Sequence, residues 1–600
     1  MSWFTNLAQA YDRITDITKD MLLPIYHMES KTDICVTIDG DGKFLHAELS
    51  DLIIKIPCTE DSSTRTNPCP HPLHDQLSYL AIDLSKRKMY LSQLEAWKSG
   101  HPKIEAVYSY INNGSLLDDL SSLTLKEPKD KLFIRFCVEI PGDKSPKLWE
   151  DDSIAEAWQT YCSTLETDKK TLCYVTGRLA QPVEKHPKGI NMSSYGAKLI
   201  SCNDETNYTY RGRFTKPYQA NSIGIEASHK AHSMLKNLIA TQKNKCDTQA
   251  IVAWTLEDGS TQPDPLEDSL NIYSVIVKTK TDDLINAQSE IGTDYAINMR
   301  NALRGIGSAD KLKNQIRRIA VMAVDAATTG RMGITFYQDL QENEYIERII
   351  SWHETCNWYF RQLKHEFISA PSADRIIAAV YGEPKGEGYA KIKKQARECM
   401  LNHVVCGEPL DRGWISAAVL RISQPFSYNK KDGGWDSWRW EQAQNVACAI
   451  IRKYYYDKKE VFALEIDKNC NDRSYLYGRL LAIADRLESH ARYIQKADSV
   501  TDKRPTNAVR YMSAFASKPL RSWKLIYGQL NPYIQRLDGA EWYQKQIDEI
   551  MSLFLPGDID DKNDTQLNGK YLLGYSLQRR DIWNRNKTIK EIQDESDEEN

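Results

Sequence analysis

The chain has 600 residues, more than one hydrophobic core usually organises, so we expect two to four domains. Its formal net charge of −4 excludes a globally basic protein, and any nucleic-acid contact must therefore use local basic patches. No apolar run approaches the ~20 residues that span a bilayer, no signal-peptide pattern opens the sequence, and the 13 cysteines are irregularly spaced. We expect a cytoplasmic protein with reduced thiols.

The first part of the chain, residues 1–285, is predicted to mix strands and helices. Apolar and polar residues alternate over 34–38 and 131–136, and 251–254 is another apolar run, which favours strands. Asp39-Gly40-Asp41-Gly42 follows the first of these strands and is typical of a hairpin turn.

From about residue 281 onward, apolar residues recur at three-to-four spacing, which predicts helices. The predicted helices span 311–326, 341–367, 438–455, 474–497, 507–517, 520–537, 541–554 and 571–583. Pro519 suits the first turn of its helix. We therefore predict an α+β protein with four parts. These are a mixed α/β region (1–285), a mostly helical middle region (286–470), an antiparallel helical bundle (471–584) and a frayed acidic tail (585–600).

Motifs of catalysis and cofactor binding are missing from the sequence, which has no nucleophile elbow, P-loop, dinucleotide fingerprint or zinc-protease motif. We predict no catalytic residue and no cofactor. Cys58, Cys69, His71 and His74 have side chains that zinc prefers, but their spacing matches no common zinc motif, and an ordinary loop is the favoured alternative. Residues 558–564 are acidic but lack the glycine and glutamate of a calcium loop.

Two stretches concentrate positive charge. Residues 296–331 hold seven Lys/Arg against two acids, a surplus of five, and residues 473–536 hold twelve against four, a surplus of eight. Such surpluses suit a phosphate backbone, although a solvated helix face gives the same pattern. The candidates in the first stretch are Arg300, Arg304, Lys311, Lys313, Arg317 and Arg318. Those in the second stretch are Arg479, Arg486, Arg492, Arg510, Lys518, Arg521 and Lys524.

A third candidate region, residues 193–242, interleaves aromatic rings and arginines around Gly212, which suits base stacking and phosphate contact. The helix that follows is predicted to bury Ile225, Ala231, Leu235 and Leu238 on one face. Its other face is predicted to expose His229, Lys230, Ser233, Lys236 and Asn237. An ordinary strand–turn–helix unit with exposed charges explains the same residues equally well.

Several segments, taken in order, carry a family resemblance. They are 210–214 (YRGRF) with Gln219-Ala220, 228–232 (SHKAH), 324–332 (VDAATTGRM), 475–482 (YLYGRLLA), 571–575 (YLLGY) and 578–580 (QRR). Together they resemble the large subunit of the subtype I-C CRISPR surveillance complex, Cascade (the Csd-one, or Cas-eight-c, family). The resemblance covers nearly the whole chain.

The resemblance implies a non-catalytic subunit of a crRNA-guided complex in antiviral defence. Members read the short protospacer-adjacent motif on duplex DNA, help to open the duplex and dock a helicase-nuclease, while the guide supplies sequence specificity. The implied partners are crRNA, target double-stranded DNA and its displaced single strand, the backbone, handle-binding and small subunits of Cascade, and the helicase-nuclease. No membrane is implied.

Roles for single residues follow from this resemblance as hypotheses. The candidates for reading the motif are the polar loop residues Ser62, Ser63, Thr64, Arg65, Asn67, Asn203, Asn207 and Tyr208. Arg211 and Arg213 are candidates for backbone contact, with an internal ion pair as the alternative, and Lys230 is a further candidate for contact with DNA or RNA. Asp325, Thr328 and Thr329 are predicted to be structural.

The C-terminal bundle resembles the small subunit, which in this family can be translated separately from the same gene. No methionine lies between Met400 and Met512, so a separate product that covers the whole bundle would need a non-AUG start codon. Two other functions stay open. One is a metal-dependent nuclease whose carboxylates come from distant parts of the sequence, and the other is a scaffold without direct DNA contact.

Overall fold

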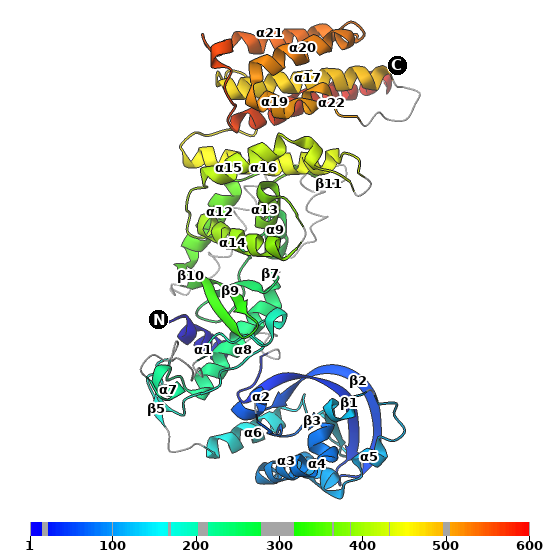
Figure 1. The fold of residues 1–600 in the computed structure, drawn as a ribbon, viewed down its shortest axis with the longest axis vertical. Helices are drawn as coiled ribbons and strands as arrows, with labels where there is room; N and C mark the ends of the chain where they lie inside the picture. Colours follow the sequence, from blue (N-terminus) through cyan, green and yellow to red (C-terminus); the bar gives the residue numbers. More distant parts are fainter. Residues whose placement is uncertain are drawn as a thin grey trace. The chain divides into compact units, whose positions relative to one another are not determined.

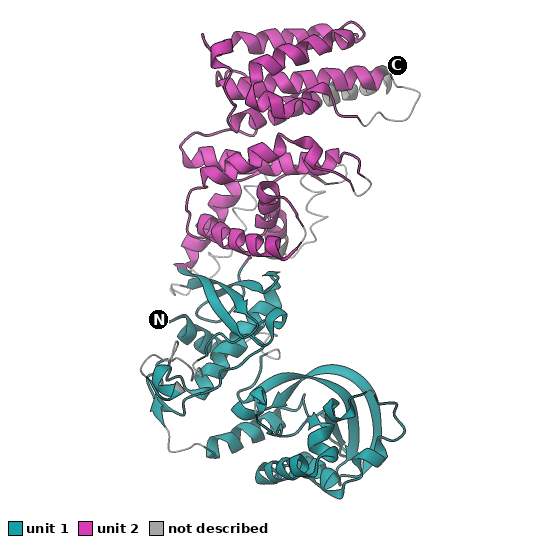
Figure 2. Cartoon of the chain, in the orientation of Figure 1, with its two compact units in different colours: residues 1–262, 317–339 teal, residues 263–316, 340–600 magenta. Residues whose placement is uncertain are grey.

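The computed structural model describes residues 2–14, 22–65, 67–98, 100–125, 127–165, 170–201, 214–277, 317–362, 365–384, 386–430, 433–495 and 504–598. The chain forms two compact units, shown in Figure 2. Unit 1 comprises Met1–Gln262 and Arg317–Asp339, and unit 2 comprises Pro263–Ile316 and Leu340–Asn600. The predicted α+β class is confirmed, because sheets with helices fill unit 1 and helices dominate unit 2 (Figure 1).

The first sheet of unit 1 has the strand order β2-β1-β4-β3. Its strands are β1 (His27–Asp39), β2 (Phe44–Pro57), β3 (Asp75–Gln76) and β4 (Phe133–Glu139). β1 pairs antiparallel with β2 through the predicted turn and parallel with β4. The strands expected at 34–38 and 131–136 are thus confirmed, the latter beginning at Phe133.

Three helices cover this sheet: α3 (Leu84–Trp97), α4 (Pro102–Asn113) and α6 (Asp152–Thr164). Alternate residues of β1, namely Ile34, Val36 and Ile38, are buried in one core with Ile134, Phe136 and Val138 of β4. This core includes Trp97 of α3 and Trp158 of α6. The period of two in the sequence therefore marks the side of the sheet on which the helices pack.

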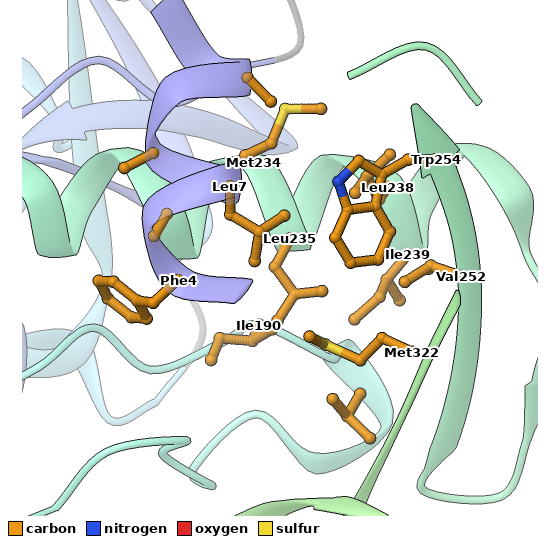
Figure 3. Packing of buried hydrophobic residues seen from close by; sticks show 14 of the residues in the cluster. Phe4, Leu7, Ile190, Met234, Leu235, Leu238, Ile239, Val252, Trp254 and Met322 are labelled. Carbon is orange, nitrogen blue, oxygen red and sulfur yellow. The ribbon is translucent and has the colours of Figure 1, made fainter. Parts of the chain in front are cut away.

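A second core of unit 1 joins segments from both ends of its sequence. It lies between α1 (Trp3–Arg13), α8 (Ile225–Gln242), β8 (Gln249–Thr255) and β9 (Arg318–Thr328). Figure 3 shows Phe4 and Leu7 of α1 beside Met234 and Leu235 of α8, with Trp254 and Met322 from the sheet. This sheet has the order β10-β9-β8-β7, with β7 (Lys245–Cys246) and β10 (Arg331–Gln341) at its edges.

The helix predicted at 311–326 is wrong, because the described part of that segment is strand β9. Residues 319–324 are all buried, so both faces of the strand are covered and the alternation that identifies a strand is lost. A continuous apolar run of this kind has no period that separates a strand from a buried helix.

The exposed face predicted for α8 is wrong, because none of its five residues is exposed, and His229, Lys230 and Lys236 are half-buried. Ile225, Ala231, Leu235 and Leu238 are buried as expected, but Ser233 and Asn237 are buried too. The Ser233 hydroxyl donates to the Leu23 carbonyl (3.1 Å) and accepts from the Leu23 amide (2.8 Å). The segment that precedes β1 therefore covers the side of α8 that was expected to face solvent.

Shorter elements complete unit 1: α2 (Glu60–Thr64), α5 (Leu116–Asp119), β5 (Thr171–Leu172), β6 (Leu179–Ala180) and α7 (Pro217–Ala220). The predicted structural role of Asp325 agrees with its contact, since its carboxylate accepts from the Thr248 hydroxyl (2.6 Å). Thr328 ends β9, and its hydroxyl accepts a hydrogen bond from the Gly330 amide (3.4 Å) in the turn to β10.

Unit 2 begins with helices around a small hairpin. The elements are α9 (Ser269–Val277), α12 (Glu342–Thr355), β11 (Trp358–Gln362), β12 (His365–Ser369), α13 (Ala373–Tyr381), α14 (Glu387–Val404), α15 (Arg412–Ile422) and α16 (Ser437–Asp457). The single helix predicted at 341–367 is therefore wrong beyond Thr355, where the antiparallel β11–β12 pair begins at Trp358. Aromatic residues at 358–360 favour a strand there.

The last part of unit 2 contains the predicted C-terminal helices. They are α17 (Arg473–Gln495), α18 (Asn507–Arg510), α19 (Met512–Ser517), α20 (Pro519–Ile534), α21 (Ala540–Ser552) and α22 (Lys570–Glu598). Pro519 occupies the first turn of α20, as predicted. The tail expected to be frayed instead continues α22 to Glu598. None of the described helices combines the length and apolar character needed to span a bilayer.

Two glycines bring α17 and α22 into backbone contact. A Cβ atom on Gly478 would lie 1.9 Å from the Tyr571 carbonyl oxygen, and one on Gly574 would lie 2.2 Å from the Tyr475 carbonyl oxygen. Only glycine permits an approach this close. The YLYGR and YLLGY segments therefore form the crossing between these helices, which the sequence did not reveal.

Candidate nucleic-acid interface

The predicted reader residues 62–65 line a pocket of ≈ 440 Å³ in unit 1. Its walls come from β1, β2, the short helix α2 and the loop 188–195. Segments that are more than 100 residues apart in the sequence thus meet at one surface depression. Cationic, polar and apolar side chains line it together with the carboxylates of Glu29 and Asp33, and side chains of the first three kinds are those that contact nucleic acids.

The hydroxyl groups on α2 are used mainly within the helix. Ser62 forms a reciprocal capping box with Thr59 and is buried. The Ser63 hydroxyl donates to the Glu60 carbonyl (2.8 Å), and that of Thr64 donates to the same oxygen (3.3 Å). These contacts hold a helix of only five residues in place. The hydroxyl oxygens of Ser63 and Thr64 can still accept a hydrogen bond from a ligand at the pocket.

Arg65 is held by internal contacts. It adopts the left-handed conformation at the end of α2 (φ 46°), and its guanidinium pairs with the fully buried Asp75. It also donates to Gln76 Oε1 (3.0 Å) and lies 4.4 Å from the centroid of the Tyr79 ring. Burial raises the pKa of Asp75 to about 6, although Arg65 opposes this shift. Arg65 therefore stabilises the pocket wall.

Two lysines of this pocket were missed by the sequence reasoning. Lys131 is exposed and Lys188 is half-buried, and neither forms an ion pair with any residue in the described part of the chain. Burial lowers the pKa of the Lys188 ammonium. Its Nζ lies 5.7 Å from the centroid of the Tyr195 ring. No local charge cluster marks either lysine, so only the fold brings them together.

A glycine turn places Lys188 beside Tyr195. The Gly189 amide donates to the Tyr195 carbonyl (2.8 Å), and Gly189 has φ +74°. A Cβ atom there would lie 2.8 Å from Tyr195 Cε2. A larger residue would therefore clash with the ring while being strained in its backbone. The turn is a rigid support for one wall of the pocket.

Apolar side chains border the same pocket. Ile53 of β2 is 57% exposed and Met192 is 49% exposed. Together with Tyr195 they give an accessible apolar edge next to two lysines that pair with no carboxylate among the described residues. Apolar side chains of this kind can insert at a base step, and lysines can contact the phosphates beside it.

The zinc alternative finds no geometric support. Across the described ranges, no three His, Cys, Asp or Glu side chains form a group that could hold a metal ion. The His74 ring accepts from the Phe136 amide (3.2 Å), and the Cys69 thiol lies 3.9 Å from the Thr59 hydroxyl. Burial raises the pKa of the Cys58 thiol. These side chains belong to the core and loop contacts of unit 1.

Several bundle candidates are used inside unit 2. Arg479 is 4% exposed, and its Nε donates to Gln578 Oε1 (2.9 Å). Arg492 pairs with Glu488, which is fully buried. Arg486 is half-buried, and its Cζ lies 5.7 Å from the centroid of the Trp583 ring. Burial lowers the pKa of both Arg479 and Arg486.

The remaining bundle candidates lie at the surface. Arg510 and Arg521 are exposed, and neither has an ion pair among the residues that the structure describes. Lys518 donates to the Asp564 carbonyl (2.8 Å). Lys524 forms an exposed ion pair with Asp561 (2.9 Å). The charge surplus of this stretch is thus only partly available to a ligand.

Three candidates of unit 1 are paired with acids. Lys230 contacts Asp12 (2.7 Å) and Glu226 (2.6 Å). Arg317 contacts Asp258 (3.2 Å), and Arg318 contacts Asp339 (2.6 Å).

Asn67 is exposed and is outside the pocket lining. The other candidates lie outside the described residues, namely Asn203, Asn207, Tyr208, Arg211, Arg213, Arg300, Arg304, Lys311 and Lys313.

Comparison with known proteins identifies the family. A comparison with curated proteins found no match. A family model described as CRISPR-associated protein (Cas_Csd1) matches residues 7–583, which is nearly the whole chain and includes both units. The resemblance drawn from the sequence is thereby confirmed. This chain belongs to the CRISPR-associated Csd1 family, a component of type I-C Cascade.

Proposed function

We propose that this chain is the non-catalytic large subunit of a crRNA-guided complex, in which it recognises the protospacer-adjacent motif, aids strand opening and docks the helicase-nuclease. Family membership supports the assembly. The observation that supports DNA contact most directly is the pocket of unit 1, where Lys131 and Lys188 lack carboxylate partners among the described residues and Met192 is accessible.

The chemistry of the pocket fits a duplex at the point where its strands separate. The lysines neutralise phosphates and so hold the backbone. Gln76 and the hydroxyls of Ser63 and Thr64 provide polar groups at the same pocket for base edges. Met192 and Ile53 are the wedge side chains in this proposal, because unstacking a base step requires an apolar group in its place.

In the bundle, the exposed residues Arg510 and Arg521, together with Lys518, form the surface that we assign to the displaced strand. Arg479 and Arg492 are left out of this assignment, because their charges are used inside unit 2. A strand that follows exposed cations without base contacts binds independently of its sequence and weakens with added salt.

The test uses the complex assembled with crRNA and the other subunits, and two duplexes that differ only in the motif. The double variant Lys131→Gln/Lys188→Gln is expected to weaken binding to the motif-bearing duplex at least tenfold. Met192→Ala is expected to slow strand opening, followed by a fluorescent base analogue beside the motif. Lys524→Gln is the matched control, because it removes a surface lysine that is already paired with Asp561.

The two alternative functions give different results. If the chain is a scaffold without DNA contact, neither the double lysine variant nor Met192→Ala changes duplex binding or strand opening. Crosslinks from the duplex flank then reach only other subunits. A nuclease predicts metal-dependent cleavage by the purified chain. Either result would overturn the proposal.

A further inference from the structure

Unit 2 contains a larger pocket, of ≈ 680 Å³, that the proposed function does not use. It lies among four helices: α13, α14, α15 and α16. Residues from all four helices and from the connection after α13 line it, so its shape depends on the tertiary packing of this part of unit 2. Arginine, lysine and tyrosine side chains dominate its polar lining.

The charges of this pocket do not balance. Its cations are Arg375, Lys393, Arg421 and Arg439, and its acids are Asp374 and Glu383. Glu383 pairs with Arg439, and Asp374 pairs with Lys393 (2.8 Å) and with Arg397. Both carboxylates are therefore occupied. Arg375 and Arg421 have no ion-pair partner in the part of the chain that the structure describes.

These two arginines are held in place by neutral contacts. Arg375 Nη2 donates to Gln442 Oε1 (3.3 Å), and its guanidinium lies 4.3 Å from the centroid of the Phe360 ring. Burial lowers the pKa of Arg375, although Asp268 opposes this shift. A half-buried guanidinium that forms no ion pair with the described residues is costly even with the Asp268 carboxylate nearby, and an anion in the pocket would compensate it further.

Arg421 packs against a glycine that accepts no larger residue. A Cβ atom on Gly382 (φ +82°) would lie 2.6 Å from Arg421 Nη2, so the absence of a side chain there makes room for the guanidinium. The Gly382 carbonyl accepts from the Tyr389 hydroxyl (2.6 Å), which fixes this turn. Arg421 Nε is buried and has no hydrogen-bond partner among the described residues. The pocket thus contains two arginines, held by packing, that form no ion pair among the described residues.

Aromatic rings line the same pocket. Tyr381, Tyr389 and Tyr428 are part of its wall, and Tyr381 is 41% exposed. The edge of the Tyr381 ring packs on Trp414 at a centroid distance of 5.8 Å, which holds the ring while leaving part of it accessible. An accessible tyrosine in the same pocket as two guanidinium groups suits a ligand with both a phosphate and a planar base.

We propose that this pocket binds a nucleotide, with its phosphate contacted by Arg375 and Arg421 and its base stacked on Tyr381. The phosphate and base can belong to a free nucleoside phosphate or to one unit of a nucleic-acid strand, and both share this chemistry. The site lies within unit 2 and shares no residue with the pocket of unit 1, so the two proposals can be tested separately.

The test measures equilibrium binding to the full chain by calorimetry, with four probes: inorganic phosphate, AMP, ATP and a short single-stranded oligonucleotide. The nucleotides are expected to bind at least tenfold more tightly than inorganic phosphate. Arg421→Gln and Arg375→Gln are each expected to weaken this binding at least tenfold. Arg412→Gln is the matched control, because it removes an exposed arginine at the start of the same helix, α15, outside the pocket.

Tyr381→Ala and Tyr381→Phe test the base contact at a partly exposed position. Tyr381→Phe is expected to retain nucleotide affinity and Tyr381→Ala to lose it, while the affinity for inorganic phosphate stays unchanged in both. Tighter binding of the oligonucleotide than of AMP, lost in Arg421→Gln, would identify a strand as the source of the nucleotide.

Three outcomes would overturn the proposal. They are no binding of any probe at millimolar concentration, equal affinity for phosphate and nucleotides, and binding that Arg412→Gln weakens as much as Arg421→Gln. Arg421→Lys keeps the positive charge, and it serves as the second variant if Arg421→Gln reduces the helical content of the chain.

Discussion

The pocket beside α2 and the C-terminal bundle both contain basic residues, but the two regions use them differently. In the pocket, Lys131 and Lys188 come from segments with no marked charge surplus, and no described carboxylate pairs with them. In the bundle, Arg479 and Arg492 belong to a stretch with a surplus of eight positive charges, but both form contacts inside unit 2. Local charge in the sequence is therefore a poor measure of charge available at the surface.

The difference has a physical cause. A long helix such as α17 turns its residues to all sides, so part of its basic residues face the other helices and must find acceptors there. Around the pocket, Lys131 lies just before the strand β4 and Lys188 lies in the loop 188–195, so neither belongs to a long helix enclosed by other helices. Substitutions in both regions can test this division between internal and available cations.

The largest effect is expected where α17 and α22 cross. Gly478→Ala should lower the free energy of unfolding by more than about 3 kcal/mol, because its methyl group would overlap the Tyr571 carbonyl. Urea unfolding of the full chain, followed by tryptophan fluorescence, measures this. Gly528→Ala in α20 is the control, because open space surrounds that position and alanine favours a helix. Equal midpoints for both variants would show that the helices do not meet at Gly478.

The next largest effect on the free energy of unfolding is expected when an internal cation of the bundle is removed. Arg492→Gln should cost about 3 kcal/mol, because it leaves the buried Glu488 carboxylate without its ion-pair partner. Arg510→Gln removes an exposed arginine and should change the unfolding free energy by less than about 0.5 kcal/mol. The same urea experiment compares the two. If both variants unfold at the wild-type midpoint, the internal assignment of Arg492 fails.

A smaller effect is expected for the available cations of the pocket. In the assembled complex, Lys131→Gln and Lys188→Gln should each reduce the slope of log affinity for duplex DNA against log salt by about one. Arg479→Lys keeps the charge of a buried residue and should leave the slope unchanged. Filter binding at several salt concentrations gives these slopes. Unchanged slopes in the lysine variants would remove the pocket from the DNA interface.

The smallest effect concerns the proton uptake of a buried histidine. Burial lowers the pKa of His353 to about 3, so the folded chain keeps this ring neutral while the unfolded chain protonates it below about pH 6.5. Its contribution to stability is therefore full above pH 6.5 and is lost as the pH falls. Lowering the pH from 6.5 to 5.5 costs about 1 kcal/mol for such a group.

This loss can be isolated by variants. His353→Gln should show a fall in unfolding free energy between pH 6.5 and 5.5 that is smaller than the wild-type fall by this amount. His46→Gln is the control, because His46 is exposed on β2. A wild-type pH dependence in His353→Gln would mean that the ring is not buried in the neutral form.

Sequence patterns predicted those elements whose residues keep a regular period, even where most of the element is buried. β1 alternates larger apolar residues with Cys35 and Thr37, α17 repeats apolar residues at three-to-four spacing, and both were predicted correctly. The prediction failed at β9, whose continuous apolar run has no such period, and at Ser233, which a distant segment covers. In both cases the burial depends on a segment that is distant in the sequence, which the local pattern of residues does not identify.

The candidate site shows the same limit. Residues 62–65 were predicted because polar side chains follow one another in a loop, and they do line the pocket. Lys131 and Lys188 were missed, since acids accompany the lysines in both segments and leave no marked local surplus of positive charge. Arg65 was predicted as a reader, but its contact with Asp75 depends on the loop that folds back toward it.

By itself, the sequence determined the fold class, the helices of the C-terminal bundle and, through short ordered segments, the family. These properties depend on local periodicity and on residue identity, which a linear chain displays. Only the tertiary structure decided which cations remain available, which glycines let helices touch and that Arg375 and Arg421 line the same pocket. Those properties depend on pairs of residues distant in the chain, and pairing becomes visible only after the chain has folded.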